Sequence, residues 1–303
     1  MTIRIGSVEV DRVLEWVGPI KTVDEMFPDT PAQLWTDDLA PHHWTPATRA
    51  YRAAIQTWVI RSAGRVILVD TGVGNDRDRP QAPALDHLRT DYLHRLGDIG
   101  VQPADVDVVV NTHIHYDHVG WNTTLEDGSW VPTFPNATYL VPEVDYDYFH
   151  PENAEGMRPP RTDDERARFA GIRLVFADSI APIAEAGQLQ TWRGGHRVDD
   201  TVRLEPAPGH TPGSSVAWLE SGSGAVFVGD LVHTPLQLSR PDDCCAFDVD
   251  AGQARASRSA VLARASQLGA AVFPAHFAGR GAARLAQSGA DDETTWCEGL
   301  SEV

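Results

Sequence analysis

The chain has 303 residues, of which 42% are hydrophobic, so it can bury a large core in one α/β domain or two small ones. Its 43 acidic and 25 basic residues give a formal charge of −18, which argues against nucleic acid and anionic membranes as partners. The sequence lacks both the ~18 uninterrupted apolar residues of a membrane helix and the apolar region of a signal peptide, so we expect a cytoplasmic protein.

The N-terminal part combines a predicted strand with an irregular arm. Residues 3–17 alternate like a strand, or a hairpin with a break near Asp11. Residues 18–48 are rich in proline, which blocks regular elements, and in aromatic residues, which a solvated linker lacks. We expect an ordered arm that covers a pocket as a lid or forms a contact in a homodimer; a surface loop held by its tryptophans is the alternative.

The central part predicts three strands and a helix. Residues 56–62 and 65–69 are typical of two strands joined by the tight turn Ala63-Gly64. Helical spacing of apolar residues predicts a helix over 84–97. The β-branched run 106–110 indicates a buried strand.

The C-terminal part predicts a second set of strands and helices. Residues 137–141, 201–205, 214–220, 225–228 and 271–273 are expected to be strands, with the hairpin signal 221–224 joining two of them. A capping box at 162–165 indicates the start of a helix, 178–186 a short helical piece, and 250–268 a longer helix.

Four possible metal ligands follow the strand 106–110 directly: His113, His115, Asp117 and His118. Alternate residues of an extended segment project the same way, so His113 and His115 can hold one ion while Asp117 and His118 reach a second. Loops at strand ends commonly carry the chemistry of a site. A chance grouping of polar residues on a loop is the alternative.

Further candidates each lie beside a predicted strand. Asp70 ends the strand 65–69, His210 stands in the glycine- and proline-rich turn 208–213, Asp230 ends the strand 225–228, and His276 follows the strand 271–273. Two ions about 3.5 to 4 Å apart can be bridged by one carboxylate and one hydroxide, the latter acting as nucleophile. We place the first metal on His113, His115 and His210 and the second on Asp117, His118 and His276, with Asp230 bridging. This donor set favours zinc, although iron, manganese and cobalt also fit.

The sequence resembles the metallo-β-lactamase superfamily of metal-dependent hydrolases. The pieces that match are, in order, Asp70–Gly72, Thr112–Gly120, Gly209–Gly213, Val228–Asp230 and Pro274–His276. The resemblance implies one domain over 1–303 with the αβ/βα four-layer sandwich, in which two mixed β-sheets are flanked by helices and the metals lie at one edge. It also implies that Asp70 orients the ligand loop from outside the metal shell.

Within the superfamily, the ligand set resembles that of the N-acyl homoserine lactonases and the methyl parathion hydrolase group. Those lactonases have a tyrosine three residues after the bridging aspartate, where this chain has His233, and a Gly-Gly pair where this chain has Gly120-Trp121. We expect Asp117 and His233 to be catalytic, with His233 as a general acid or oxyanion donor. A role outside the metal shell, a further ligand, or simple packing are alternatives for His233.

The expected function is hydrolysis of a carboxylic ester or lactone of an apolar small molecule by a dinuclear metal centre. Phe27, Trp121 and Phe277 are expected to line the substrate pocket. A β-lactam hydrolase, a thioesterase or a phosphotriesterase of the same fold is an enzymatic alternative, as is a mononuclear iron persulfide dioxygenase. The non-enzymatic alternative is a ligand-binding module stapled by metals.

Overall fold

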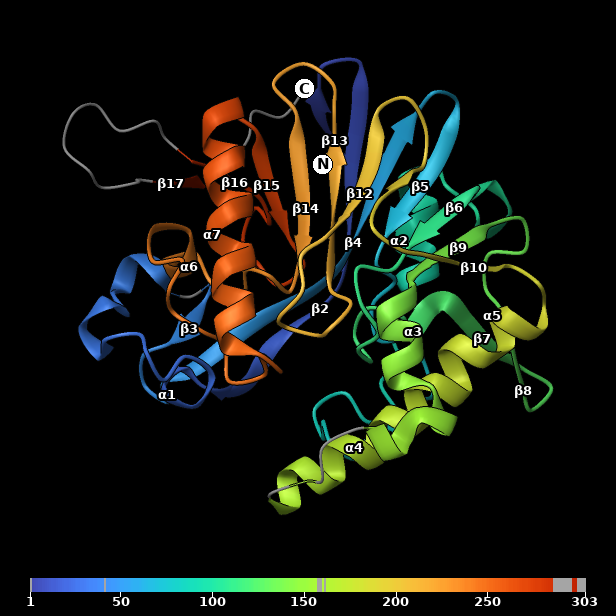
Figure 1. Cartoon of the computed structure of the whole chain (residues 1–303), viewed down its shortest axis with the longest axis horizontal. Helices are drawn as coiled ribbons and strands as arrows, with labels where there is room; N and C mark the ends of the chain where they lie inside the picture. Colours follow the sequence, from blue (N-terminus) through green and yellow to red (C-terminus); the bar gives the residue numbers. More distant parts are fainter. Residues whose placement is uncertain (1, 41, 157–159, 161, 286–295, 299–303) are drawn as a thin grey trace. The chain divides into compact units, whose positions relative to one another are not determined.

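The computed structural model describes residues 2–40, 42–156, 160, 162–285 and 296–298 (Figure 1). The chain divides into two compact units. The first unit comprises Met1–Val10, Trp16–Ala54 and Gly194–Val303, and the second comprises Asp11–Glu15 and Ile55–Arg193. The single domain over 1–303 stays a prediction. Among the described residues, no helix is long and apolar enough to cross a membrane.

The strands form two large mixed sheets and one small one. The eight-stranded sheet has the order β1 (Thr2–Ile5), β2 (Val8–Thr22), β4 (Ala50–Ser62), β5 (Arg65–Val69), β6 (Val108–Val110), β9 (Thr138–Pro142) and β10 (Leu189–Trp192), with β3 (Trp44–Thr45) paired to β4. The seven-stranded sheet has the order β11 (His196–Arg197), β12 (Val202–Pro206), β13 (Ser215–Leu219), β14 (Ala225–Gly229), β15 (Ala271–Pro274), β16 (Ala283–Leu285) and β17 (Trp296–Glu298). The small sheet is the hairpin β7 (Thr123–Glu126) and β8 (Ser129–Pro132).

The described helices are short, apart from two. They are α1 (Val23–Met26), α2 (Tyr92–Asp98), α3 (Glu143–Phe149), α4 (Asp163–Val175), α5 (Ala181–Glu185), α6 (Leu236–Ser239) and α7 (Ala251–Leu268). Short 3-10 helices occupy Ala32–Leu34, Asp37–Leu39, Pro103–Asp105, Gly120–Asn122 and Pro151–Gly156, and a π-helical turn occupies Phe176–Ile180.

In the first unit, the long helix α7 lies along the seven-stranded sheet (Figure 1). Its buried residues Leu262 and Ala265 pack with Val226 and Val272 of the sheet in one apolar cluster. Asp250 caps the helix by accepting a hydrogen bond from the backbone N–H of Gln253, as the predicted start near residue 250 requires. Burial of this face fixes the helix, and with it the turn that precedes it.

The predicted arm over 18–48 is ordered and belongs to the first unit. Strand β2 runs on to Thr22, which caps α1 in a capping box with Glu25. Phe27, Trp35 and Trp44 are buried in one cluster with Tyr51 of β4, so the aromatic residues of the arm build a core of their own. Its role as a lid or homodimer contact stays a prediction.

The second unit contains a buried ion cluster. The fully buried guanidinium groups of Arg77 and Arg79 share the carboxylate of Asp178, at 2.8 and 2.7 Å. Arg77 also donates to the backbone carbonyl of Thr123 at 2.7 Å, and its guanidinium lies 4.1 Å from the ring centre of Trp130. This cluster joins the π-helical turn to the chain that follows the ligand loop.

The helix predicted over 84–97 is wrong in its first half. Only Tyr92–Asp98 is helical, whereas residues 84–91 form a loop closed by a hydrogen bond from the backbone N–H of His87 to the carbonyl of Arg77. His87 has a positive φ of 51°, which an α-helix does not allow. Leu85 is buried from this loop, so tertiary packing satisfies the apolar spacing that suggested a helix.

The predicted break near Asp11 is also misplaced. The turn between the first two strands lies at Gly6-Ser7, where Gly6 has a positive φ of 60°, and β2 runs through Asp11 without interruption. Asp11 is buried and forms an ion pair with Arg61 of β4. The ion pair with Arg61, which is distant in sequence, explains why the charged Asp11 can lie inside a strand.

Strand direction places the candidate side chains of each unit at a common edge. In the first unit, β14 and β15 are parallel neighbours, so Asp230 and His276 emerge from the same edge of their sheet. In the second unit, β5 and β6 are parallel neighbours, which brings Asp70 beside Thr112 at the start of the ligand loop. Each unit therefore carries its own set of candidate ligands.

Candidate metal centre

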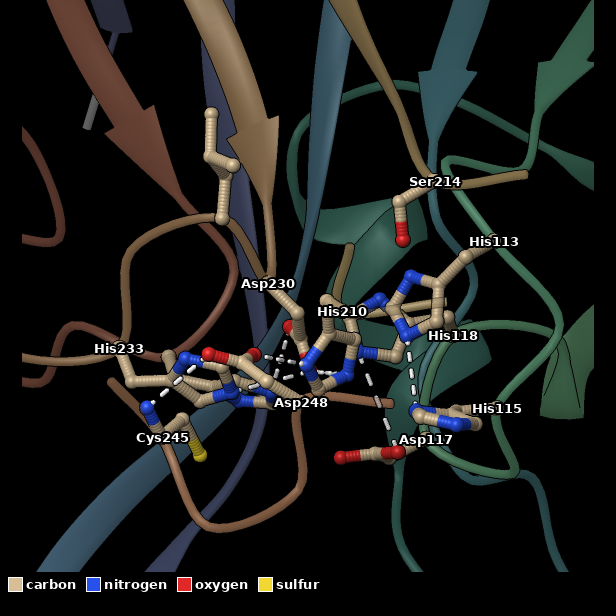
Figure 2. Close-up of polar contacts among 12 residues, drawn as sticks. His113, His115, Asp117, His118, His210, Ser214, Asp230, His233, Cys245 and Asp248 are labelled. Atoms are coloured by element: carbon tan, nitrogen blue, oxygen red, sulfur yellow. Dashed lines mark hydrogen bonds and ion pairs between the residues drawn. The ribbon is translucent and has the colours of Figure 1, made fainter. Parts of the chain in front are cut away.

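In the first unit, the carboxylate of Asp230 is surrounded by imidazole nitrogens. Its Oδ2 atom lies 3.1 Å from Nε2 of His210 and 3.2 Å from Nε2 of His233. Its Oδ1 atom lies 2.8 Å from Nε2 of His276. Figure 2 shows the rings of His210 and His233 directed at this carboxylate. Because all four side chains are buried, the set is held by protein atoms rather than by water.

The second ring nitrogen of two of these histidines faces a hydrogen-bond acceptor. Nδ1 of His276 lies 2.8 Å from the carbonyl oxygen of Ala54, and Nδ1 of His210 lies 3.1 Å from Oδ1 of Asp248. A carbonyl or carboxylate cannot donate, so the proton of each neutral ring is on Nδ1. The Nε2 lone pairs of both rings therefore point at Asp230.

A lone pair and a carboxylate oxygen about 3 Å apart repel each other unless a proton or a metal ion lies between them, and a metal ion takes the neutral form of both rings. Around an ion bound at about 2.0 to 2.1 Å, neighbouring ligand atoms are separated by about 3.0 to 3.4 Å. The distances from Asp230 to His210 and His276, 3.1 and 2.8 Å, are close to that range. The residues of the first unit thus fit a divalent metal ion.

Asp248 is a candidate positioning residue that the sequence did not reveal. Its Oδ2 atom accepts a hydrogen bond from the backbone N–H of Cys245 at 3.1 Å and lies 3.4 Å from the guanidinium of Arg258 on α7. These contacts hold the carboxylate of Asp248 in place, and this carboxylate in turn orients the ring of His210. No motif marks Asp248, since it lies 38 residues from His210 in an irregular segment.

The turn that carries His210 depends on close backbone approach. Gly209 has a positive φ of 135°, and a Cβ atom there would lie 2.0 Å from the backbone nitrogen of Ala254. The backbone N–H groups of Val249 and Asp250 donate to the carbonyls of His210 and Gly209. The start of α7 therefore positions the ligand, which explains the glycine in the motif.

The charges around this set shift several pKa values. Burial lowers the pKa of His210, but the carboxylates of Asp230 and Asp248 outweigh it and raise this pKa to about 9. Burial tends to raise the pKa of Asp248, but the hydrogen bond and charge of His210 hold it below its usual value. Burial lowers the pKa of His233, and Asp230 only partly opposes this. Without metal, the proton shared by His210 and Asp248 therefore resides on His210.

In the second unit, the ligand loop consists of bends and turns rather than the extended segment expected. It nevertheless pairs the same side chains, because Nε2 of His113 lies 3.0 Å from Nδ1 of His115 and Nε2 of His118 lies 3.9 Å from Oδ1 of Asp117. Figure 2 shows these side chains on one loop. Two nitrogens 3.0 Å apart suit neighbouring ligands of one ion.

Asp70 lies where the resemblance implied. Its Oδ2 atom is 2.8 Å from Nδ1 of His118, and its Oδ1 atom accepts the backbone N–H of Thr112 at 2.8 Å. Asp70 itself has a positive φ of 58°, a strained conformation for this residue. The carboxylate therefore holds both the ring of His118 and the start of the ligand loop.

A second buried carboxylate supports the far end of the same loop and was missed from the sequence. Glu15 of β2 accepts hydrogen bonds from the backbone N–H of Val73 and from Nε1 of Trp121, both at 2.7 Å. Trp121 stacks on Tyr92 with ring centres 5.0 Å apart. The Glu15 signal in the sequence is only an acidic residue inside an apolar strand pattern.

The aromatic residues expected in the pocket are buried in the cores of their units. Phe27 packs against Tyr51 at 5.1 Å and Phe277 against His43 at 5.5 Å, both as ring-centre distances in the first unit. Trp121 belongs to the core of the second unit. Their role in lining a substrate pocket stays a prediction.

Comparisons with known proteins agree with the motifs. A model of the metallo-beta-lactamase superfamily matches residues 51–276. The chain is 33% identical over 116 residues to the N-acyl homoserine lactonase AttM of Azorhizobium caulinodans, a match that covers 38% of this chain and 36% of that protein. The match to the AttM protein of Agrobacterium fabrum, at 30% identity, also covers 36% of the relative, so the chain spans little more than a third of these proteins.

Solved structures show the same fold at low identity. The crystal structure of the hydrolase AbOPH in the β-lactamase superfamily has a TM-score of 0.82 and 24% identity, covering 100% of this chain and 98% of that one. AidC, a dizinc quorum-quenching lactonase in complex with the product N-hexanoyl-L-homoserine, has a TM-score of 0.73 and 21% identity, with the same coverage. As its motifs predicted, and as the family model over most of its length shows, the protein belongs to the metallo-β-lactamase superfamily and has its fold.

Proposed function

We propose that the ligand sets of the two units form one dinuclear metal centre in a metal-dependent hydrolase. The first metal would be held by His113, His115 and His210, the second by Asp117, His118 and His276, with Asp230 between them. The observation that carries this proposal is the pair of Nε2 atoms, from His210 and His276, that face Asp230 at 3.1 and 2.8 Å. Further support comes from the family match, which spans the residues of both sets. Zinc suits a donor set of imidazoles and carboxylates best, with iron, manganese and cobalt as alternatives.

When bound, such ions lower the pKa of a coordinated water and polarise a carbonyl oxygen. Side chains of the protein transfer the proton and orient the ligands. Asp117 is proposed to accept the proton of the attacking water and pass it to the leaving oxygen, because it is the carboxylate of the ligand loop and its side chain is 11% exposed, against 1% for His118. Asp70 and Asp248 keep their histidines in the tautomer that a ligand needs. The predicted catalytic role of His233 stays a prediction.

The proposed substrate is a carboxylic ester or lactone of an apolar small molecule. The support is similarity to proteins described as N-acyl homoserine lactonases, one of them with its hydrolysed product bound. A strongly acidic chain suits a neutral substrate better than an anionic one, since the charge of −18 repels anions. The cytoplasmic location and a homodimer stay predictions.

A hydrolysis panel with metal analysis tests this function. The purified protein should bind two divalent ions per chain and hydrolyse lactones or aryl esters faster than a β-lactam, a thioester or a neutral phosphotriester. The Asp230→Asn variant should lose metal and turnover together, whereas His94→Ala, which alters an exposed histidine, should keep both. A protein with two ions and no turnover on any of these would support a metal-stapled binding module, and a single iron would support the dioxygenase.

A further inference from the structure

His233 differs from His210 and His276 in the environment of its Nδ1 atom. Nδ1 of His210 faces Asp248 and Nδ1 of His276 faces the carbonyl of Ala54, which keeps the proton of each ring on Nδ1. Nδ1 of His233 is buried and has no hydrogen-bond partner among the residues that the structure describes. The acceptor that would fix His233 as a metal ligand is therefore missing.

The remaining nitrogen of His233 determines its tautomer. Nε2 lies 3.2 Å from Oδ2 of Asp230, and a carboxylate oxygen only accepts hydrogen bonds. With its proton on Nε2, the ring donates to Asp230 and leaves a bare lone pair on Nδ1. With its proton on Nδ1, the Nε2 lone pair of the ring would repel the carboxylate of Asp230. The buried Nδ1–H group would also lack an acceptor, so both ring nitrogens would destabilise this tautomer. The first tautomer is favoured.

The backbone and the ring of His233 are both held in place. The hydroxyl of Tyr51 donates to its carbonyl oxygen at 2.6 Å, and its own N–H donates to Oε1 of Gln237 at 2.8 Å. The ring lies against those of Phe27 and His276, with ring centres 6.4 and 5.4 Å away. This enclosure leaves the side chain almost inaccessible, at 3% exposed, which argues against direct contact with a substrate.

We propose that His233 is a positioning residue, whose Nε2–H group holds Oδ2 of Asp230 while Oδ1 stays directed at His276. The ligand atoms of Asp230, His233 and His276 lie within 4.8 Å of one another, so a shared ion is the competing arrangement that the tautomer argues against. The inference rests on the proposed function in one respect, that Asp230 is a metal ligand. It assigns His233 neither a bond to metal nor a proton transfer to substrate.

Two substitutions of His233 distinguish a positioning residue from a metal ligand and from a catalytic residue. In His233→Gln, the side-chain amide keeps an N–H donor near the position of Nε2, whereas His233→Leu removes the donor at similar size. We expect the Leu variant to lose about 10- to 100-fold in metal affinity and the Gln variant to keep most of it, because partners outside the metal shell commonly have effects of this size. The absorption spectrum of the cobalt-substituted Gln variant should match that of the wild-type protein.

The matched control is His276→Gln, which removes a nitrogen that the tautomer argument assigns to metal. This variant should lose an ion and change the cobalt spectrum, as a true ligand must. If His233→Gln and His233→Leu change the spectrum in the same way as His276→Gln, His233 is a ligand and the proposal is wrong. If both variants keep wild-type affinity and spectrum but lose turnover, His233 is catalytic and the proposal is equally wrong.

Nitrogen NMR of histidine-labelled wild-type protein provides a test that needs no variant to fold. Two-bond couplings between ring protons and ring nitrogens distinguish a protonated Nε2 from a protonated Nδ1. We expect His233 to be protonated on Nε2 and His210 and His276 on Nδ1 in the zinc-loaded protein, with resonances assigned from the Gln variants. A metal-bound Nε2 on His233 would overturn the inference. A protein that binds no metal would refute the proposed function, while the tautomer of His233 in the metal-free state would still decide the inference.

Discussion

At the scale of single residues, the proposed centre depends on groups that are not among its candidate ligands. Asp70 and Asp248 each lie beside the Nδ1 atom of one histidine, and the carbonyl of Ala54 does the same for a third. Each partner fixes which nitrogen carries the proton, so the ligand atom is ready before a metal arrives. If the proposed centre binds metal, these acceptors should therefore influence its metal affinity.

Removal of Asp248 should weaken metal binding without unfolding the protein. In Asp248→Ala, the ring of His210 loses the acceptor of its Nδ1–H group, so we expect a loss of about 10- to 100-fold in zinc affinity. Competition with a chromogenic chelator measures this. Asp242→Ala, which changes an exposed carboxylate in the same segment, should bind zinc like the wild-type protein. Equal affinities in both variants would contradict the role of Asp248.

The stability of the metal-free protein should fall between pH 6.5 and pH 9. The pKa of His210 is about 9 in the folded chain, against about 6.5 when unfolded, because Asp230 and Asp248 stabilise its protonated form. This stabilisation is fully present below pH 6.5 and is lost as the pH rises through the folded pKa, a change of about 3 kcal/mol at most.

Urea unfolding of chelator-treated protein at a series of pH values measures this slope. The His210→Asn variant should flatten it, and His94→Ala, at an exposed histidine, should retain it. Zinc requires a neutral imidazole, so in its presence the stability should instead rise over the same pH range. A metal-free protein whose stability increases toward pH 9 would contradict this assignment of the proton.

At the scale of elements, turns and loop anchors position the ligands. The His210 turn lies against the start of α7, and the ligand loop is held by β2 through Glu15. Neither contact is local in sequence. Elements that carry no ligand thus determine where the ligands lie.

Substitution of Gly209 should be far more damaging than substitution of a glycine in open space. In Gly209→Ala, the new Cβ atom meets the backbone of Ala254 at 2.0 Å and the residue keeps an unfavourable φ, so we expect a loss of more than about 3 kcal/mol. Gly187→Ala shares a positive φ but meets nothing within 4 Å, and it should cost about 1 kcal/mol. Urea denaturation compares the two, and similar losses would show that close packing at Gly209 is unimportant.

Loss of Glu15 should destabilise the end of the ligand loop. Glu15→Ala leaves the buried donors of Val73 and Trp121 without their acceptor, which should cost about 2 to 4 kcal/mol. Iodide should also quench the tryptophan fluorescence of the protein more strongly as the indole of Trp121 loosens. Glu9→Ala removes only an exposed ion pair and should change stability by less than about 0.5 kcal/mol. A Glu15→Ala variant with the stability and iodide quenching of the wild-type protein would show that Glu15 does not hold this end of the ligand loop.

At the scale of the whole molecule, metal should stabilise the protein as a unit. Because the proposed ligands come from both units, bound zinc would link their unfolding. At a free zinc concentration of about 1,000 times Kd, binding adds about 4 kcal/mol. Calorimetry should therefore show a higher Tm with zinc and a single, sharper transition. Asp230→Asn should abolish both effects, and a zinc-independent Tm would contradict a shared centre.

The sequence predicted most strands, and the candidate ligands lie in turns and loops beside them. Both follow from local rules, since runs of β-branched residues end at glycine-rich turns and ligands cluster where parallel strands stop. Its errors concern long-range contacts. His87 adopts a left-handed conformation inside a predicted helix, and Asp11 finds its partner in Arg61, 50 residues away. Asp248 and Glu15 were invisible for the same reason, because a buried acceptor is recognised only by the donors that surround it.

The parallel pairing of β14 and β15 gives the first unit a practical advantage. Asp230 and His276 closely follow the ends of β14 and β15, so the fixed spacing of neighbouring strands, about 4.8 Å, contributes to their positions. Substitutions in the parts of the loops after these strands that lie away from Asp230, His233, Asp248 and His276 can therefore change which substrates enter while the candidate ligands keep their spacing. A laboratory seeking new catalysts from this scaffold can diversify those parts, provided that the two strands and the loop residues that hold the candidate ligands are left unchanged.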